Sequence, residues 1–271
     1  MPGEPRLNVT DEPALTDTGA PPAVLVHGVG ADLRSWDRVA ERLRQSRRVI
    51  RLDLRGHGLS APIRETIALE DFAADVLEAM DRTGADIADL VGFSLGGMIA
   101  QCLAVGWPDR FRRVALLSAV AGRTPEEREK VVSRLELLRR DGIPAVVGAA
   151  RERWFSEAFA SRHPDRIEAR IEELKANDLE SYIEAYRVFG TSEMAPRLHE
   201  IRHPTLVLTG EFDIGSNTRM ARLMHERIPE SELVILPDLK HSILVEAPDL
   251  VADHLLRFLD GRTEQREAGA V

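Results

Sequence analysis

Short apolar segments and amphipathic segments alternate along most of the chain. The apolar segments are rich in Val, Ile and Leu and predict strands at 22–28, 47–54, 89–94, 112–118, 204–210 and 232–237. Apolar residues at helical spacing predict helices at about 35–45, 69–83, 95–106, 217–228 and 247–260. Strands that alternate with helices in this way are typical of a parallel sheet with helices on both faces. We therefore expect an α/β fold, in which segments 7–9 and 14–16 are candidates for further strands near the start.

The alternation stops between residues 121 and 200, where only helices are expected. Thr124, Pro125 and Glu127 form the pattern of a capping box with a first-turn proline. Further helices are predicted at about 144–159, 165–176 and 179–189. A helical insertion between two strands of a parallel sheet lies near the carboxyl ends of the strands, where such sheets bind ligands. The sequence thus predicts a core at 1–120 and 201–261, a helical cap at 121–200 and a flexible tail at 262–271.

Composition and charge narrow the range of partners. The chain has 271 residues, 44% of them hydrophobic and 30% charged, with a formal charge of −9, which suits a globular protein that does not bind nucleic acid. The single cysteine, Cys102, cannot form an internal disulfide. The first residues lack the basic start and apolar run of a signal peptide, and no apolar stretch approaches the ~20 residues of a membrane helix. We expect a cytoplasmic protein that does not enter a membrane.

The main chemical signal is the segment Gly92-Phe93-Ser94-Leu95-Gly96, between a predicted strand and a predicted helix. This is the context of a nucleophile elbow, in which a sharp turn strains the serine backbone and projects its hydroxyl out of the sheet. Glycines two positions before and after the serine remove side chains that would collide with the neighbouring strand and helix. A chance match in a glycine-rich turn is the alternative. The strand before and the helix after favour a catalytic Ser94.

A serine nucleophile needs a general base and a carboxylate that orients the base. His241 follows the last predicted strand, and Asp213 ends the strand before it. Adjacent parallel strands bring both side chains to the edge of the sheet that carries Ser94. Glu211 is a weaker candidate for the acid, and no acid directly follows the strand at 112–118. The alternative to a catalytic role is an ordinary loop position, exposed to solvent for His241 and at a turn or helix N-cap for Asp213.

Two loops after early strands support the same site. In His27-Gly28-Val29-Gly30, the glycines allow the backbone to approach the nucleophile, so the N–H groups of Val29 and Leu95 are expected to form an oxyanion hole. His27 is expected to be structural, and the turn at 53–60 is expected to be scaffold. The other histidines lack metal-ligand spacing. No metal and no cofactor are expected.

With these residues in this order, the chain resembles the α/β-hydrolase family from about Pro21 to Leu259. The resemblance implies a mostly parallel, eight-stranded sheet with residues 121–200 as a cap over the site. The stretches GFSLGGMIAQ, PTLVLTGEFD and KHSILVEAPDLV are most similar to small bacterial esterases, 3-oxoadipate enol-lactonases and carbon–carbon bond hydrolases. Dehalogenases and epoxide hydrolases of this family need a carboxylate nucleophile at the elbow. Because this position is Ser94, both classes of enzyme are excluded.

These observations predict a serine hydrolase that cleaves a small carboxylic ester or lactone through an acyl-enzyme on Ser94. A carbon–carbon bond hydrolase of a keto-enol acid or a serine-type perhydrolase would use the same triad, and a ligand-sensing protein on this fold is the non-enzymatic alternative. The expected partner is a small-molecule substrate, and the chain is expected to be a monomer or homodimer. Candidate pocket residues in the cap are Trp154 and Phe155 as apolar walls, Tyr182 or Tyr186 as hydrogen-bond donors, and Arg123 or Arg153 as carboxylate partners.

Overall fold

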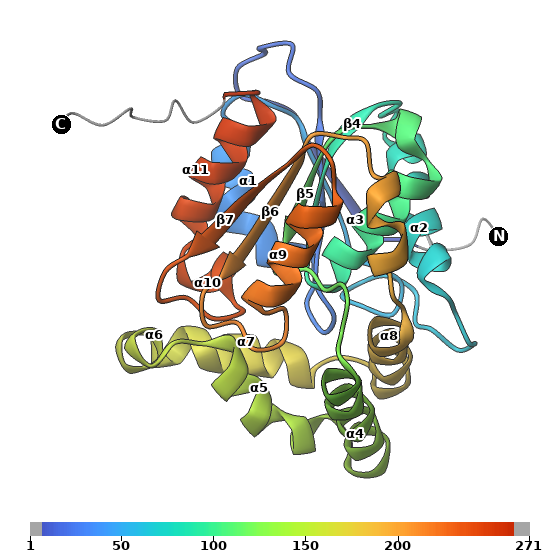
Figure 1. The fold of residues 1–271 in the computed structure, drawn as a ribbon, viewed down its shortest axis with the longest axis vertical. Helices are drawn as coiled ribbons and strands as arrows, with labels where there is room; N and C mark the ends of the chain where they lie inside the picture. The colour runs from blue at the N-terminus through green and yellow to red at the C-terminus, as the bar shows by residue number, and fades with distance from the viewer. Residues whose placement is uncertain (1–6, 263–271) are drawn as a thin grey trace.

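A computed structural model describes residues 7–262 and contains one mixed sheet at its centre (Figure 1). The strands are β1 (Val9–Glu12), β2 (Ala23–Val26), β3 (Val49–Leu52), β4 (Ala88–Phe93), β5 (Phe111–Leu117), β6 (Thr205–Gly210) and β7 (Ser231–Leu236). Their order is β1-β3-β2-β4-β5-β6-β7, and only the β1–β3 pair is antiparallel. The α/β class is confirmed. Of the predicted tail, residues 263–271 lie outside the described residues.

The expected number of eight strands is wrong for the described residues, where the sheet has seven. The difference lies at the start of the chain. The candidate segment at 7–9 leads into β1, whereas the segment at 14–16 forms no strand. Leu15, its central residue, is 63% exposed. A strand there would bury no apolar side chain, so nothing compensates the entropy of ordering a second opening strand.

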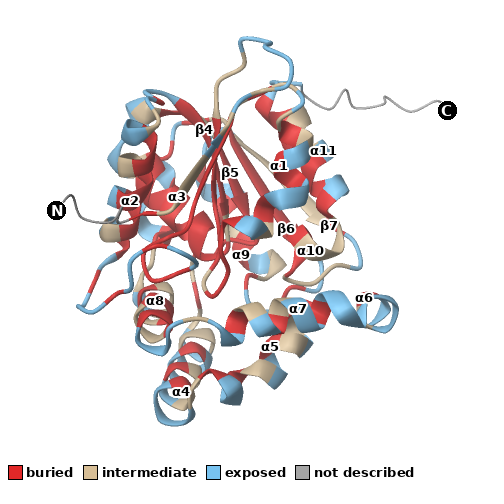
Figure 2. Cartoon of the chain, turned by 180° about the vertical axis from the view of Figure 1, so that it is seen from behind, coloured by how far each residue is buried: buried red, intermediate tan, exposed pale blue. Residues whose placement is uncertain are grey.

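Helices cover both faces of the sheet because successive strand residues point to opposite sides. The helices of the core are α1 (Asp37–Leu43), α2 (Leu69–Arg82), α3 (Leu95–Gly106), α9 (Thr218–Arg227), α10 (Ile243–Glu246) and α11 (Pro248–Leu259). Val24 and Val26 of β2 pack in a cluster with α2, α3 and α9, while Ala23 and Leu25 pack with α1 and α11. Figure 2 shows the central strands, such as β2, β4 and β6, buried between these two layers, whereas the edge strand β7 is only partly buried.

The segment between β5 and β6 forms a separate group of helices at one end of the sheet (Figure 1). Its helices are α4 (Pro125–Asp141), α5 (Val147–Trp154), α6 (Glu157–Arg162), α7 (Pro164–Lys175) and α8 (Leu179–Thr191). They share an apolar cluster of their own, which includes Leu138, Ile171 and Leu174. The predicted capping box is present, since Thr124 accepts a hydrogen bond from the Glu127 N–H and Glu127 accepts one from the Thr124 N–H.

The predicted helix at 144–159 is divided in the structure. A 3-10 turn (Ile143–Val146) leads into α5, which ends at Trp154, and α6 begins after Ser156. Other 3-10 turns occur at Leu33–Trp36, Pro108–Arg110 and Ala195–Glu200. Within residues 7–262, none of the helices has the length and apolar character needed to span a bilayer.

Candidate active site

Ser94 lies at the turn between β4 and α3, in a backbone conformation that is rare for a residue with a side chain. Its φ is 55° and its ψ is −111°. A Cβ on Gly92 would lie 2.1 Å from the Gly96 carbonyl oxygen, and a Cβ on Gly96 would lie 2.1 Å from that of Val26. Neither position has room for a side chain, so both glycines are required by the turn. The geometry is that of the nucleophile elbow expected from the sequence.

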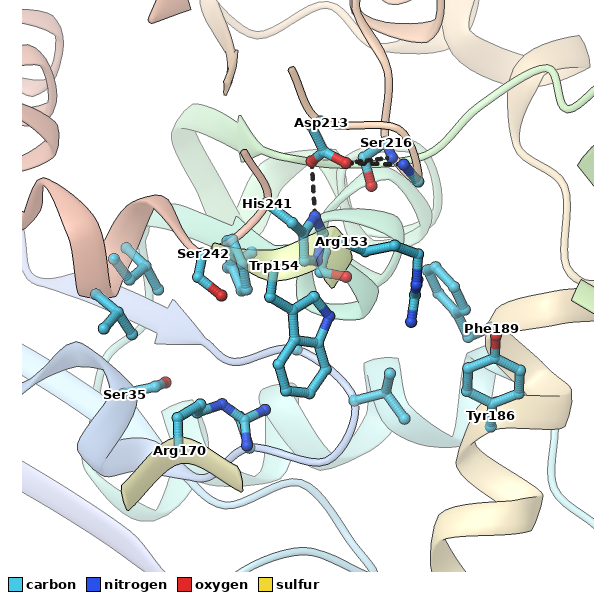
Figure 3. A pocket seen from close by; sticks show the side chains of 18 of the residues that line it. Ser35, Arg153, Trp154, Arg170, Tyr186, Phe189, Asp213, Ser216, His241 and Ser242 are labelled. Atoms are coloured by element: carbon cyan, nitrogen blue, oxygen red, sulfur yellow. Dashed lines mark hydrogen bonds and ion pairs between the residues drawn. The ribbon is translucent and has the colours of Figure 1, made fainter. Parts of the chain in front are cut away.

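His241 and Asp213 meet across the ends of β7 and β6. His241 Nδ1 lies 2.6 Å from Asp213 Oδ2 (Figure 3). Because a carboxylate only accepts, Nδ1 carries the proton and Nε2 is left as an acceptor. Glu211, the weaker candidate for the acid, is exposed. It accepts a hydrogen bond from the Asp238 N–H rather than from His241.

Asp213 is buried, and every contact of its carboxylate favours the ionised form. Oδ1 accepts hydrogen bonds from the N–H groups of Gly215 and Ser216, each 2.9 Å away. Burial by itself raises the pKa of Asp213, but the charge and hydrogen bond of His241, together with the two N–H groups, hold the pKa below its ordinary value. The carboxylate is therefore charged at neutral pH and holds the imidazole in one orientation.

Ser94 and His241 line the same cavity, with Phe93 packed against the imidazole at a ring-centroid distance of 5.1 Å. Among the hydrogen bonds of the described residues, none joins the Ser94 hydroxyl to the His241 ring. The two groups are thus brought into one site without being directly bonded. Bonds of this kind are often long before a substrate is bound.

The loop after β2 lies directly against Ser94. A Cβ on Gly28 would be 3.1 Å from the Cβ of Ser94, which shows how closely the backbone approaches. Val29 follows and lines the cavity. Leu95 is the first residue of α3, so its N–H has no acceptor within the helix. No other backbone bond from these two N–H groups is present in the described part of the chain.

His27 holds this loop from below, as the sequence predicted. Its Nε2 accepts from the Leu54 N–H at 3.0 Å and its Nδ1 donates to the Gly28 carbonyl at 2.8 Å. This pair of bonds requires a neutral ring, and burial lowers the pKa of His27 accordingly. Asp53 also acts as scaffold, since its carboxylate accepts from the N–H groups of Leu33 and Leu59.

The comparison with known proteins agrees with this geometry. Residues 21–248 match the family model for the alpha/beta hydrolase fold. The chain belongs to the α/β-hydrolase family. It is 28% identical to an (E)-2-((N-methylformamido)methylene)succinate hydrolase of Acinetobacter baylyi, over 88% of this chain and 90% of the relative, and 26% identical to 3-oxoadipate enol-lactonase 2 of the same organism, over 84% of each.

The crystal structure of an enol-lactonase from Burkholderia xenovorans superimposes with a TM-score of 0.87 and is 28% identical, covering 94% of this chain and 96% of that one. The family match and these relatives identify the protein as a hydrolase. In the described residues, no group of three or more His, Cys, Asp or Glu side chains is placed to hold a metal ion.

The cavity of this hydrolase lies between the carboxyl ends of the strands and the cap. Its volume is about 90 Å³. The predicted pocket residues that line it are Arg123, Arg153, Trp154, Tyr182 and Tyr186. Phe155, which we also expected as a wall, does not line it. α5 ends at Trp154 and the backbone becomes extended, so the next side chain turns into the cap core, where it stacks on Phe159 at 5.9 Å.

Sequence reasoning missed several lining residues. They are Ser35, Phe93, Val131, Arg134, Arg170, Phe189 and Leu244 among others. Helical spacing would have indicated some of them: Phe189 lies seven residues after Tyr182 on α8, and Val131 lies three before Arg134 on α4, so each pair shares a helix face. No comparable local signal marks Arg170.

Proposed function

We propose that this protein is a serine hydrolase that cleaves a small carboxylic ester or lactone through an acyl-enzyme on Ser94. The observation that carries the proposal is the placement of three groups around one cavity. Ser94 stands on a strained elbow, and the hydrogen-bonded pair of His241 and Asp213 lines the same space. A nucleophile, a base and an orienting carboxylate are the parts that acyl transfer requires.

In the first step, Ser94 Oγ attacks the substrate carbonyl carbon and its proton passes to His241 Nε2. Asp213 accepts the hydrogen bond of Nδ1 and stabilises the imidazolium that forms. The N–H groups of Val29 and Leu95 donate to the developing oxyanion. When the tetrahedral intermediate collapses, the leaving oxygen takes the proton from His241. In a lactone, the leaving hydroxyl stays attached to the acyl group.

In the second step, water attacks the acyl-enzyme carbonyl while His241 Nε2 removes its proton. The intermediate collapses with Ser94 Oγ as leaving group, which regains its proton from His241. The free acid then leaves the cavity. A second oxyanion forms on the way and is stabilised by the same two backbone groups, so one set of donors serves both halves of the reaction.

The size of the cavity supports a small substrate. At about 90 Å³, it has room for roughly six to nine water-sized groups, which suits a compact substrate. The names of the relatives agree with this, since the lactonases and the succinate hydrolase act on compact organic acids or their derivatives.

The test is fluorophosphonate labelling with peptide mapping, run beside hydrolysis of 4-nitrophenyl acetate. The parent is compared with Ser94→Ala and His241→Ala. Ser118→Ala is the matched control, because Ser118 is also a buried serine with positive φ but does not line the cavity. We expect label on Ser94 in the parent and in Ser118→Ala, and no ester turnover in the two active-site variants. Label on another residue, or turnover that survives Ser94→Ala, would refute the proposal.

A further inference from the structure

The cavity beside Ser94 is lined by an excess of positive charge. Four arginines line it: Arg123, Arg134, Arg153 and Arg170. The only acid among the described lining residues is Asp213, whose carboxylate is already occupied by His241 and two N–H groups. A small apolar acyl group would gain nothing from four cations in its pocket. The charge therefore bears on what kind of substrate is bound.

Three of these arginines gather around Tyr186. Arg134 donates to the Tyr186 hydroxyl at 2.8 Å, and Arg123 lies over the Phe189 ring at 4.6 Å. Arg153 donates through Nε to the Ala149 carbonyl at 3.1 Å. Among residues 7–262, no carboxylate lies within ion-pair distance of any of the three. The planar groups are thus held in place by a hydroxyl, a ring and a carbonyl rather than by an acid.

Arg123 is the clearest case of a buried charge without a partner among the described residues. Its side chain is buried, with only 5% of the residue exposed, and both Nη1 and Nη2 are buried without a hydrogen-bond partner among the described residues. Burial lowers the pKa of Arg123 to about 10, which still leaves it protonated at neutral pH. A buried, unpaired guanidinium is costly for the fold. A ligand with acceptor atoms would supply the hydrogen bonds that Nη1 and Nη2 lack.

Arg170 forms a second cationic position, separate from this group. It comes from α7 and lies over the Trp154 ring at 4.6 Å. In the view of Figure 3, the guanidinium groups of Arg170 and Arg153 lie on opposite sides of the Trp154 indole. Glu173 is the acid nearest to Arg170, with 3.5 Å between Oε2 and Nη1, but without hydrogen-bond geometry, since Nη1 of Arg170 has no hydrogen-bond partner.

Among the described residues, Glu173 is thus the one carboxylate within ion-pair distance of any of the four arginines, so anionic groups of a ligand can occupy both cationic positions. We propose that the natural substrate carries two carboxylates besides its scissile ester or lactone. One is bound by Arg123 with Arg134 and Arg153, and the other by Arg170. Guanidinium groups bind carboxylates through paired N–H donors in a plane, and stacking on Phe189 and Trp154 holds those planes fixed. The scissile bond in this inference rests on the proposed function. The two carboxylates of the substrate are inferred from the arginines.

The test measures binding directly, so that it does not depend on turnover. Succinate, glutarate and adipate are titrated into the parent and into Ser94→Ala by isothermal titration calorimetry. Butyrate is the matched monocarboxylate, and inorganic phosphate is the alternative anion. We expect at least one dicarboxylate to bind about tenfold or more tightly than butyrate, because it makes a second set of charge-assisted hydrogen bonds.

The variants Arg123→Met and Arg170→Met then assign the two positions. Each is expected to weaken binding of the preferred dicarboxylate about 10- to 100-fold, towards the affinity of butyrate. Arg140→Met is the matched control, because Arg140 is an exposed arginine on the same helix as Arg134 and lies outside the cavity. It is expected to bind like the parent. Circular dichroism of each variant shows that the fold is retained.

Equal binding of mono- and dicarboxylates would overturn the inference, as would a preference that survives both variants. Tightest binding of phosphate would also overturn it and indicate a phosphorylated substrate. Hydrolysis of 4-nitrophenyl acetate, measured on the same samples, separates the two proposals. Ester turnover without dicarboxylate binding contradicts only the substrate class, whereas dicarboxylate binding without any ester turnover contradicts the proposed function.

Discussion

Buried charges are treated in opposite ways in the two regions of the molecule. In the core, Arg55 donates from Nε and Nη2 to the two carboxylate oxygens of Asp75, both at 2.6 Å, and Arg47 donates to Asp89 at 2.9 Å. In the segment that covers the site, Arg123 is equally buried and has no such partner among the described residues. The core pairs its buried cations, whereas the cap leaves one unpaired beside the proposed nucleophile.

This difference suggests two roles for a buried charge, one in the stability of the fold and one in the binding of a ligand. A paired charge in the core is compensated within the folded chain, so its removal affects stability. In the proposed substrate complex, the unpaired charge of the cavity is compensated by the ligand, so its removal is expected to affect binding.

Asp213→Asn is expected to lower kcat about 10⁴-fold, because an amide no longer holds His241 in the required tautomer. The folded structure is expected to remain, since the side chain keeps its size and its acceptor oxygen. The measurement is the steady-state hydrolysis of 4-nitrophenyl acetate. Glu211→Gln, two residues earlier and exposed, is the control and should keep the parent rate. Equal losses in the two variants would contradict the assignment of the acid.

Arg55→Met is expected to lower the free energy of unfolding by about 3–5 kcal/mol, because it leaves the buried carboxylate of Asp75 without its main partner. Arg123→Met is expected to leave stability unchanged or to raise it by about 1 kcal/mol, because it removes a charge that has no partner. Urea unfolding followed by circular dichroism gives both values. If the two variants lose the same stability, the contrast between core and cap is wrong.

The free energy of unfolding is expected to fall as the pH drops from about 6.5 to about 3. Burial, together with the nearby His27, lowers the pKa of His57 to about 3 from an ordinary value of 6.5. The unfolded chain therefore binds a proton in this window that the folded chain does not, and acid favours unfolding. The slope attributable to one such histidine is about 1.4 kcal/mol per pH unit.

The measurement is the free energy of unfolding of the parent and of His57→Gln at several pH values between 7 and 4. Carboxylates titrate in both proteins, so the difference between the two curves isolates the histidine. His57→Gln should show the shallower slope. Parallel curves would mean that His57 is protonated in the folded protein, contrary to its burial. His27, which is also buried with a lowered pKa, adds to the slope of both proteins.

The smallest effect concerns the helix of the cap that carries Arg134. Thr124→Ala removes the side chain that accepts from the Glu127 N–H at the start of α4. The expected loss of stability is about 1 kcal/mol, the usual value of an N-cap. Ser133→Ala, at an exposed position on the same helix, should cost almost nothing. A loss in Ser133→Ala as large as in Thr124→Ala would show that the capping bond does not stabilise α4.

Local pattern was sufficient for most of the sheet. The strand predicted at 204–210 is found at Thr205–Gly210, and the helix predicted at 95–106 is found at Leu95–Gly106. These elements can be predicted from residues close together in the sequence, because apolar runs and helical spacing indicate which segments are buried. The surroundings of the elbow were also predictable, since Gly92 and Gly96 lie within two residues of Ser94.

The division of the helix predicted at 144–159 was not predictable in this way. Ser156 donates from its N–H and its hydroxyl to the carboxylate of Glu246, at 2.9 and 2.5 Å, across 90 positions of sequence. The same serine begins α6 by accepting from the Phe159 N–H. A residue far along the chain thus helps to fix where one helix ends and the next begins, and local propensity carries no information about it.

The class of fold, the elbow around Ser94 and the order in which Asp213 and His241 follow it could all be predicted from the pattern of residues along the chain. Tertiary structure alone decided that the sheet has seven strands over the described residues, that Phe155 turns away from the cavity, and that Arg134 and Arg170 line it. The reason is physical. Strands, turns and caps depend on neighbours within a few residues, whereas the charge of a cavity depends on which faces of separate helices pack around it.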